Sequence, residues 1–253
     1  GLLIRKNQYK EAITYNYEEL HRAEAAHDTQ SIVYAKNGIG WVYMEMDDYQ
    51  HAIEWFYKSL HTTKNPDILV PFPSLYSNIG ACENTLGNHK KGLEMIDIAI
   101  RNATLCGNLS TKANSLAIKS GILVELQRPE EAEKYLQEAI SIRKHVGDPF
   151  YIVSDLFELA NFYAYTNQCD KGIQTCLEGL EYARKFNIES KLLILYVALS
   201  NNYKTCGDYK KYGETLQELM SLKDSIHERT SDQALAEMQT KYDVKKKENI
   251  IIQ

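Results

Sequence analysis

Few side chains in this 253-residue chain are spaced for catalysis or metal binding. None of the seven histidines lies four residues from another, the spacing that places two imidazoles on one face of a helix for a metal ion. The sequence also has no glycine-rich phosphate-binding motif, no GxSxG nucleophile motif and no HExxH zinc motif. We therefore predict that this chain is not an enzyme and that it takes no metal and no cofactor.

The cysteines form no recognisable metal or redox motif. Their number is odd, and no two have CxxC spacing. Cys169 and Cys176 are seven residues apart and would share a helix face, but no histidine or third cysteine completes a set of ligands. We interpret all five as small buried apolar side chains, which leaves open whether the compartment is oxidising. The five are Cys82, Cys106, Cys169, Cys176 and Cys206.

The composition is that of a globular chain with an acidic balance. Hydrophobic residues make up 44% and charged residues 25%, and the net charge is -5, which does not suit a nucleic-acid partner. The longest apolar run, Leu192 to Leu199, has eight residues against the ~20 that a membrane-spanning helix needs. Because the chain starts with Gly1 rather than Met, we expect it to be a piece of a longer protein.

A forty-residue repeat runs through most of the sequence. One column of small residues recurs at this interval: Gly40, Gly80, Ser120, Ala160 and Ser200. A second column of small residues has the same period: Ala12, Ala52, Gly92, Ala132 and Gly172. Within each repeat the apolar residues recur every three or four positions, which is the period of a helix. We therefore predict two antiparallel helices per repeat, of about 16 residues each, that approach closely at the small residues.

Residue types that end helices recur at the same interval. Gly107, Gly147 and Asn187 are types that close a helix in the left-handed conformation. After Gly147, Asp148 is a favourable N-cap residue, and Pro149 suits the first helical turn. The spacing predicts a boundary between successive repeats at each of these points.

The pattern resembles the tetratricopeptide repeat. The matching residues of the first complete repeat are Gly40, Tyr43, Tyr49, Ala52 and Phe56. The usual period is 34, and the forty-residue variant resembles the repeats of kinesin light chains and of bacterial peptide-sensing regulators. The resemblance implies an all-α, right-handed superhelix of helix pairs over residues 1–220, in which half a repeat precedes five complete pairs. The first repeat would be truncated, and residues 221–253 would form a long C-terminal helix that serves as a cap or a signalling linker.

The C-terminal segment departs from the repeat. Residues 221–253 contain no Gly or Pro, and Leu235, Met238 and Tyr242 form a thin apolar stripe that could pair with a second copy in a homodimer. The segment resembles the one that joins such repeats to a membrane helix in Bacteroidetes-type sensors, including two-component histidine kinases. The resemblance implies a periplasmic domain of an inner-membrane protein, with an adjacent membrane span and any kinase activity in missing parts. The alternative is a helix that caps the last repeat, and a cytoplasmic location.

The first helix of each pair in such repeats lines a concave groove, and residues there are candidates for ligand binding. They are Tyr34, Asn37, Trp41, Phe157, Asn161, Tyr165, Asn201 and Lys204, with Met44, Ser74, Ser77, Ala81 and Asn84 beside them. An asparagine amide offers a donor and an acceptor together, so it can pair with a peptide backbone of any sequence. Aromatic side chains add contact area with little loss of rotamer entropy. The alternative is that these amides bridge neighbouring helices.

Together these features predict a sensor domain of a signal-transduction protein that binds a peptide or a protein in its groove. Two alternatives remain open: a free-standing scaffold for protein–protein interaction, and a peptide-regulated regulator of the quorum-sensing type. The clamp of Lys and Arg with which other such repeats bind C-terminal carboxylates is absent. The inner positions hold Asn37, Ser77, Ala117, Phe157 and Val197 instead.

Overall fold

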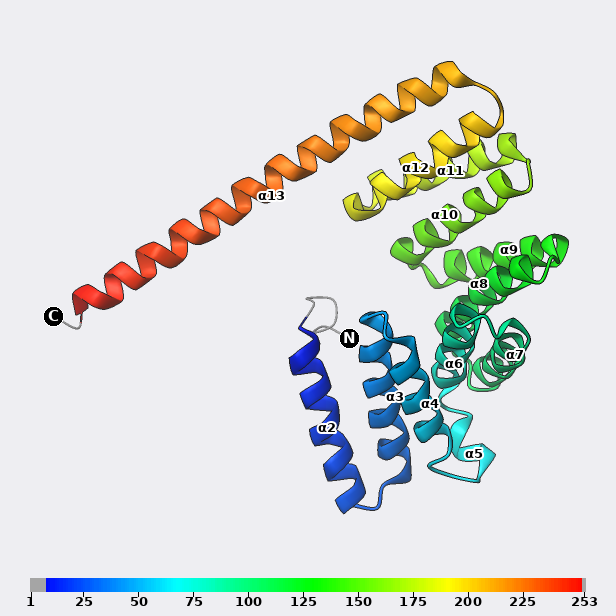
Figure 1. The fold of residues 1–253 in the computed structure, drawn as a ribbon, viewed down its shortest axis with the longest axis vertical. Coiled ribbons are helices and arrows are strands. Elements are labelled where there is room, and N and C mark those ends of the chain that lie inside the picture. Colours follow the sequence, from blue (N-terminus) through cyan, green and yellow to red (C-terminus); the bar gives the residue numbers. More distant parts are fainter. Residues whose placement is uncertain (1–7, 252–253) are drawn as a thin grey trace. The chain divides into compact units, whose positions relative to one another are not determined.

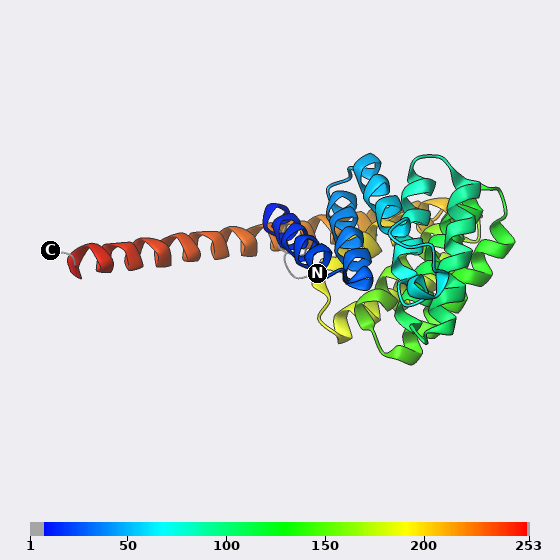
Figure 2. The ribbon, with the colours of Figure 1, turned by 90° about the horizontal axis from the view of Figure 1, so that it is seen from below.

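The computed structural model describes the backbone of residues 8–251 and the side chains of residues 8–229 and 232. This part of the chain contains twelve α-helices and no strand, so the predicted all-α class is confirmed (Figure 1). The chain forms two compact units, unit 1 (residues 1–155) and unit 2 (residues 156–253). Each unit consists of antiparallel helices joined by short turns, as the views in Figures 1 and 2 show.

Most helices have 17 residues, close to the predicted length, and α10 contributes to both units. Unit 1 contains α2 (Tyr9–Ala25), α3 (Thr29–Glu45), α4 (Tyr49–Leu60), α5 (Pro66–Leu69), α6 (Pro73–Thr85), α7 (His89–Leu105), α8 (Leu109–Glu125), α9 (Pro129–Val146) and the first part of α10 (Pro149–Tyr165). Unit 2 contains the rest of α10, α11 (Cys169–Lys185), α12 (Glu189–Thr205) and α13 (Tyr209–Ile251). The repeat assigns the pairs as α3–α4, α6–α7, α8–α9, α10–α11 and α12–α13, with α2 as the second helix of an earlier pair.

A residue with positive φ closes the turn after almost every helix, once every twenty residues. These residues are His27, Asp47, Gly87, Gly107, Gln127, Gly147, Asn167, Asn187 and Gly207. The left-handed conformation predicted at Gly107, Gly147 and Asn187 is thereby confirmed. The series has a gap at position 67, because α4 ends early and the chain forms the short helix α5 before α6 begins. The side chain of Asn65 caps α5, where its Oδ1 accepts a hydrogen bond from the Asp67 amide at 3.0 Å.

The small residues allow the two helices of a pair to pack closely. A Cβ added at Gly40 would lie 2.6 Å from the ring of Phe56, and one added at Gly80 would lie 2.6 Å from Ile96. Phe56 and Ile96 are themselves fully buried. The predicted close approach at the small columns is therefore confirmed, and the side chain that fills each contact comes from the second helix of the same pair.

The last helix, α13, has 43 residues and a length of about 65 Å. It begins at Tyr209 and passes through residue 221 without a break, so the predicted C-terminal helix continues the second helix of the last pair. Leu222 and Ile226 are half-buried. Near this point Arg229 Nη1 lies 2.9 Å from Glu189 Oε2 at the start of α12.

Beyond this ion pair, α13 extends past the end of α12 (Figure 1). The predicted stripe of Leu235, Met238 and Tyr242 falls on side chains outside the described residues, so its contacts stay a prediction. None of the helices in the described part of the chain is both long and apolar enough to cross a bilayer.

The interpretation of all five cysteines as free buried side chains is wrong. Cys169, the first residue of α11, forms a disulfide with Cys206, which directly follows α12. Cys106 is exposed, whereas Cys82 and Cys176 are buried as expected, and burial raises the pKa of each of these two thiols to about 12. The bonded pair is 37 residues apart, which no short motif marks. The repeat nevertheless brings the start of one pair's second helix beside the end of the next pair's first helix.

Candidate functional site

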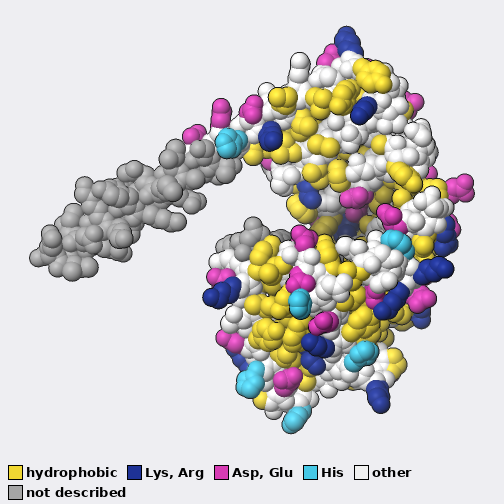
Figure 3. Space-filling model, in the orientation of Figure 1, with side chains coloured by type: hydrophobic (Ala, Val, Ile, Leu, Met, Phe, Trp, Pro, Cys, Tyr) yellow, Lys and Arg dark blue, Asp and Glu magenta, His cyan; other side chains and the backbone are white. Residues whose placement is uncertain are grey.

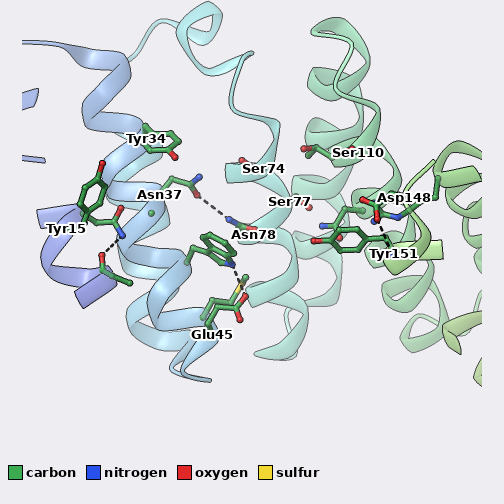
Figure 4. A pocket seen from close by; sticks show the side chains of 18 residues that line it. Tyr15, Tyr34, Asn37, Glu45, Ser74, Ser77, Asn78, Ser110, Asp148 and Tyr151 are labelled. Carbon is green, nitrogen blue, oxygen red and sulfur yellow. Dashed lines mark hydrogen bonds between the residues drawn. The ribbon is translucent and has the colours of Figure 1, made fainter. Parts of the chain in front are cut away.

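Unit 1 contains a pocket of about 740 Å³ (Figure 4). Its walls come from α2, α3, α6 and α8, and one end is closed by the α9–α10 junction. The lining residues are Ala12, Tyr15, Asn16, Tyr34, Asn37, Gly38, Trp41, Met44, Glu45, Ser74, Ser77, Asn78, Ser110, Thr111, Asn114, Arg143, Asp148 and Tyr151. The pocket is thus built mainly from the first helices of successive pairs, as predicted for the groove.

Four asparagines line this pocket, one from each of four successive lining helices: Asn16 on α2, Asn37 on α3, Asn78 on α6 and Asn114 on α8. Asn78 Nδ2 donates a hydrogen bond to Asn37 Oδ1 at 3.3 Å across the α3–α6 interface (Figure 4). Asn16 Nδ2 donates to the Ala12 carbonyl oxygen at 2.9 Å. Each amide has two donor hydrogens and two acceptor lone pairs, so these bonds use only part of its capacity.

Aromatic side chains stand beside the amides. Tyr34 is 62% exposed and Tyr15 is 57% exposed, and Figure 4 shows both on the α2–α3 side of the pocket. Trp41 is half-buried, and its Nε1 donates to Glu45 Oε1 at 2.8 Å. Tyr151 lies at the opposite end in the same view. Large exposed rings at both ends of a polar pocket offer apolar contact area to a ligand.

A buried ion pair fixes the end of the pocket at the α9–α10 junction. Arg143 Nε donates to Asp155 Oδ2 at 2.9 Å, and the two side chains are only 4% and 7% exposed. Burial raises the pKa of Asp155, and the opposing attraction of Arg143 does not cancel this effect. The guanidinium carbon of Arg143 also lies 4.4 Å from the centre of the Tyr151 ring. The pair joins α9 to α10 and orients the Tyr151 ring.

The charge of the pocket is slightly negative. Among the residues that line it, Arg143 is the only Lys or Arg, and Asp155 already neutralises it. Glu45 and Asp148 are the two carboxylates of the lining. On the face of unit 1 shown in Figure 3, acidic, basic and apolar side chains are interspersed. This pocket therefore does not offer a cluster of cations to an acidic ligand.

The structure brings some of the predicted binding residues together. Tyr34, Asn37 and Trp41 line the pocket, together with the neighbouring Ser74 and Ser77. The predicted residues of unit 2 lie on α10 and α12 and are not part of the pocket of unit 1. Among them Phe157 and Asn161 are half-buried, whereas Tyr165, Asn201 and Lys204 are exposed.

Several lining residues were not predicted. Asn78 was missed because it is equivalent to Gly38, a helix position that the prediction did not select. Asn114 is equivalent to the predicted Tyr34 and Ser74, but the prediction named no binding candidate on α8. Tyr15 was missed because it belongs to α2, the second helix of an earlier pair, and the prediction drew its candidates from first helices alone. The signal available in the sequence was the asparagine itself, an amide on the groove side of consecutive first helices.

The alternative in which an amide bridges helices holds at Asn202, next to the predicted Asn201. Asn202 is fully buried, and its Nδ2 donates to the carbonyl oxygens of Ala160 at 3.0 Å and Ala198 at 2.9 Å. Its Oδ1 has no hydrogen-bond partner. A Cβ added at Gly172 would overlap this amide, so only glycine fits there. This asparagine supports packing within unit 2 rather than binding.

Glu83 is a second buried polar group outside the pocket. It is 2% exposed and accepts hydrogen bonds from Tyr57 Oη and Asn88 Nδ2, both at 2.8 Å, and it pairs with Lys91. Burial acts to raise its pKa, but the hydrogen bonds from Lys91, Tyr57 and Asn88 outweigh burial and lower it. The bonded carboxylate links α4, α6 and α7.

Two segments of the chain match models of the tetratricopeptide repeat: residues 33–61 and residues 113–148. These two segments are therefore similar to tetratricopeptide repeats. The curated proteins include no significant match to its sequence.

Solved structures with the same fold include BtubC from P. vanneervenii, which is 17% identical, with a TM-score of 0.71 over 87% of this chain and 92% of that chain. Aspartyl phosphate phosphatase F from Bacillus subtilis is 13% identical, with a TM-score of 0.66 over 81% of this chain and 55% of that one. A signal transduction ATPase with a tetratricopeptide repeat sensor, PH0952 from Pyrococcus horikoshii, is 18% identical, with a TM-score of 0.67 over 81% of this chain and 33% of that one. The chain thus spans about half and one third of the latter two proteins. At these identities the similarity shows the fold alone.

Proposed function

We propose that this chain is the ligand-binding domain of a signal-transduction protein and that it binds an extended peptide, or a flexible segment of a partner protein, in the pocket of unit 1. The observation that carries the proposal is the row of four asparagines on successive helices, with exposed aromatic rings at both ends of the row. The volume of about 740 Å³ lies within the range of specific ligand pockets.

The spacing of the helices that carry the asparagines suits an extended backbone. Neighbouring packed helices lie about 8–10 Å apart, and an extended peptide advances about 3.3 Å per residue. A peptide that lies across the row would therefore advance about three residues per helix, and about ten residues would span the four helices. The amides of Asn37 and Asn78, which lie side by side, would contact the same stretch of the peptide. Because each amide can donate to a carbonyl and accept from an N–H, the contacts would be independent of the peptide's sequence. Specificity would come from the aromatic rings and the two carboxylates.

The charge of the lining argues for neutral or basic ligands. A ligand that is held by a free carboxylate needs unpaired cations, and the only cation of the lining is committed to Asp155. We therefore expect the pocket to favour internal peptide segments, or peptides with basic residues, over acidic tails.

The signalling role is supported by the long helix α13 and by the disulfide. A continuous helix that extends past the last pair could carry a change in the repeats to a further domain. Disulfides persist mainly in oxidising compartments, so the Cys169–Cys206 bond favours the periplasm over the cytoplasm. We propose a periplasmic sensor anchored through an adjacent membrane span, as in a two-component sensor kinase. A free-standing scaffold or a peptide-regulated cytoplasmic regulator is the alternative.

A display library of random peptides about ten residues long tests the binding function, because its members match the length of the asparagine row. Peptides selected on the immobilised chain are titrated by calorimetry against the wild type and against Tyr34→Ala. Loss of an anchoring aromatic ring should weaken binding about tenfold. Tyr209→Ala, which removes a 70% exposed ring outside the pocket, is the matched control and should bind as the wild type does. Equal affinities of both variants, or no selected peptide at all, would overturn the proposal.

A further inference from the structure

The disulfide of unit 2 lies at the point where the helix pairs lead into the longest helix. Cys169 is the first residue of α11, and Cys206 lies in the turn between α12 and α13. We propose that this disulfide is a redox-dependent staple. In its oxidised state it holds the α12–α13 turn against α11, and on reduction the turn and the first residues of α13 loosen. This inference does not depend on what the pocket of unit 1 binds.

Other repeats have different residues at the two positions that the disulfide joins. Counting back forty residues from each cysteine gives Pro129 and Thr166, and counting back eighty gives His89 and Leu126. His89 and Leu126 line the same surface pocket, so this register brings the two positions together elsewhere in the chain as well. Those residue types can make only non-covalent contacts. In unit 2 the same contact between successive pairs has become covalent.

Apart from the disulfide, the α12–α13 turn has little packing to hold it. Gly207 is in the left-handed conformation, and a Cβ added there would meet no atom within 4 Å. Tyr209, the first residue of α13, is 70% exposed. The Asp208 amide donates to the Tyr203 carbonyl oxygen at 2.9 Å, which closes the turn onto α12 but not onto α11. A segment with few buried contacts opens at a low free-energy cost, so loss of the covalent link should raise its mobility.

The bond is open to chemical reduction because Cys206 is exposed. A thiolate of an external dithiol would attack Cys206 Sγ, the S–S bond would break, and Cys169 would leave as a thiolate and take up a proton. The second thiol of the reagent would then displace Cys206 and close the reagent's own disulfide. The protein gains two electrons and two protons, and the dithiol loses them.

Asp170 favours the oxidised state of this staple. Its Oδ1 lies 3.8 Å from Cys206 Sγ, and a carboxylate so close opposes the negative charge of a thiolate. A first thiol that attacks Cys206 should therefore be displaced again easily. Reduction is completed when the second thiol of the same dithiol displaces Cys206 from the mixed disulfide. A monothiol at the same concentration should be less effective.

The test uses the whole chain, purified without reductant. Alkylation with iodoacetamide and peptide mapping should find Cys169 linked to Cys206, while Cys106 carries the label. Hydrogen–deuterium exchange is then compared before and after treatment with dithiothreitol. Peptides that contain residues 206–215 should exchange about tenfold faster after reduction, and those from α7 and α8 of unit 1 should not change.

Two variants serve as controls. Cys169→Ser should exchange like the reduced wild type and show no response to dithiothreitol, whereas Cys106→Ser removes an exposed free thiol and should keep the full response. Should Cys169→Ser fail to fold, the reduced wild type carries the comparison. Label on Cys169 and Cys206 before reduction would overturn the proposal. So would a linked protein whose turn exchanges at the same rate in both states.

Discussion

Gly172 on α11 lies against the buried amide of Asn202 on α12. The amide is held in place by its two hydrogen bonds to the carbonyl oxygens of Ala160 and Ala198, so it cannot turn aside without losing them. We expect Gly172→Ala to lower the free energy of unfolding by about 1–3 kcal/mol, because overpacking outweighs the better helix propensity of alanine. Urea unfolding followed by circular dichroism measures this difference.

Gly213→Ala is the matched control for this substitution. Gly213 also lies within a helix of unit 2, but a Cβ added there would meet no atom within 4 Å. This change should raise stability by up to about 1 kcal/mol, since glycine is unfavourable inside a helix. If both substitutions destabilise the chain equally, the close contact at Gly172 is not what makes glycine necessary.

The buried carboxylate of Glu83 makes stability depend on pH in a defined direction. Its pKa in the folded chain is lower than its ordinary value of about 4.3, so its stabilising contribution is complete above that value. The contribution is lost as the pH falls through the folded pKa. Glu83→Gln should therefore lose less stability than the wild type between about pH 5 and pH 3. Urea midpoints measured over this range test the prediction, and parallel losses in both proteins would contradict it.

For single residues, the sequence indicates which side chains could bind a ligand, but it does not show which of them are exposed and which are buried. Asn201 and Asn202 are adjacent and have the same side chain. Because neighbours on a helix are rotated by about 100°, Asn201 is exposed and Asn202 is buried. Asn37 lines the pocket, whereas Asn78, which also lines it, occupies a helix position that the prediction did not select. Which face of a helix lines a pocket depends on the angles between packed helices, and these angles cannot be read from the residues of one helix.

The junction between α9 and α10 depends on the buried pair of Arg143 and Asp155. Arg143→Met would leave the carboxylate of Asp155 buried without its partner, so we expect a loss of about 3–5 kcal/mol in the free energy of unfolding. Adding Asp155→Leu should restore most of this loss, since neither charge then remains to be buried. A double-mutant cycle measured by chemical unfolding checks this. Additive losses in the double variant would show that the two side chains do not stabilise the junction as a pair.

The helices themselves were the most predictable part of the molecule. The forty-residue period follows from steric requirements that repeat identically: a small residue at each helix crossing and a left-handed residue at each turn. The Cys169–Cys206 bond was not predicted because it joins two successive helix pairs. The two cysteines are brought together by the stacking of the pairs, and their spacing in the sequence matches no local motif. The short helix α5 was also missed, since it replaces one turn without changing the overall period.

At the scale of the whole molecule, α13 is predicted to associate with a second copy. Leu235, Met238 and Tyr242 are too few to stabilise an isolated helix, because tertiary packing supplies most helical stability. We expect the chain to form a dimer and Met238→Glu to convert it to a monomer without loss of the repeats. Asp232→Ala, a change at an exposed position of the same helix, should leave the dimer intact. Light scattering after size-exclusion chromatography measures the mass, and a monomeric wild type would favour the capping role.

We propose that an extended peptide binds along the asparagine row of unit 1. The most direct test is the hydrogen-exchange footprint of the tightest peptide selected from the random library. We expect slower exchange in the parts of α3, α6 and α8 that carry Asn37, Asn78 and Asn114, because bound peptide both covers and rigidifies these helices. Protection that is confined to unit 2 or to α13, with these three helices unchanged, would contradict it.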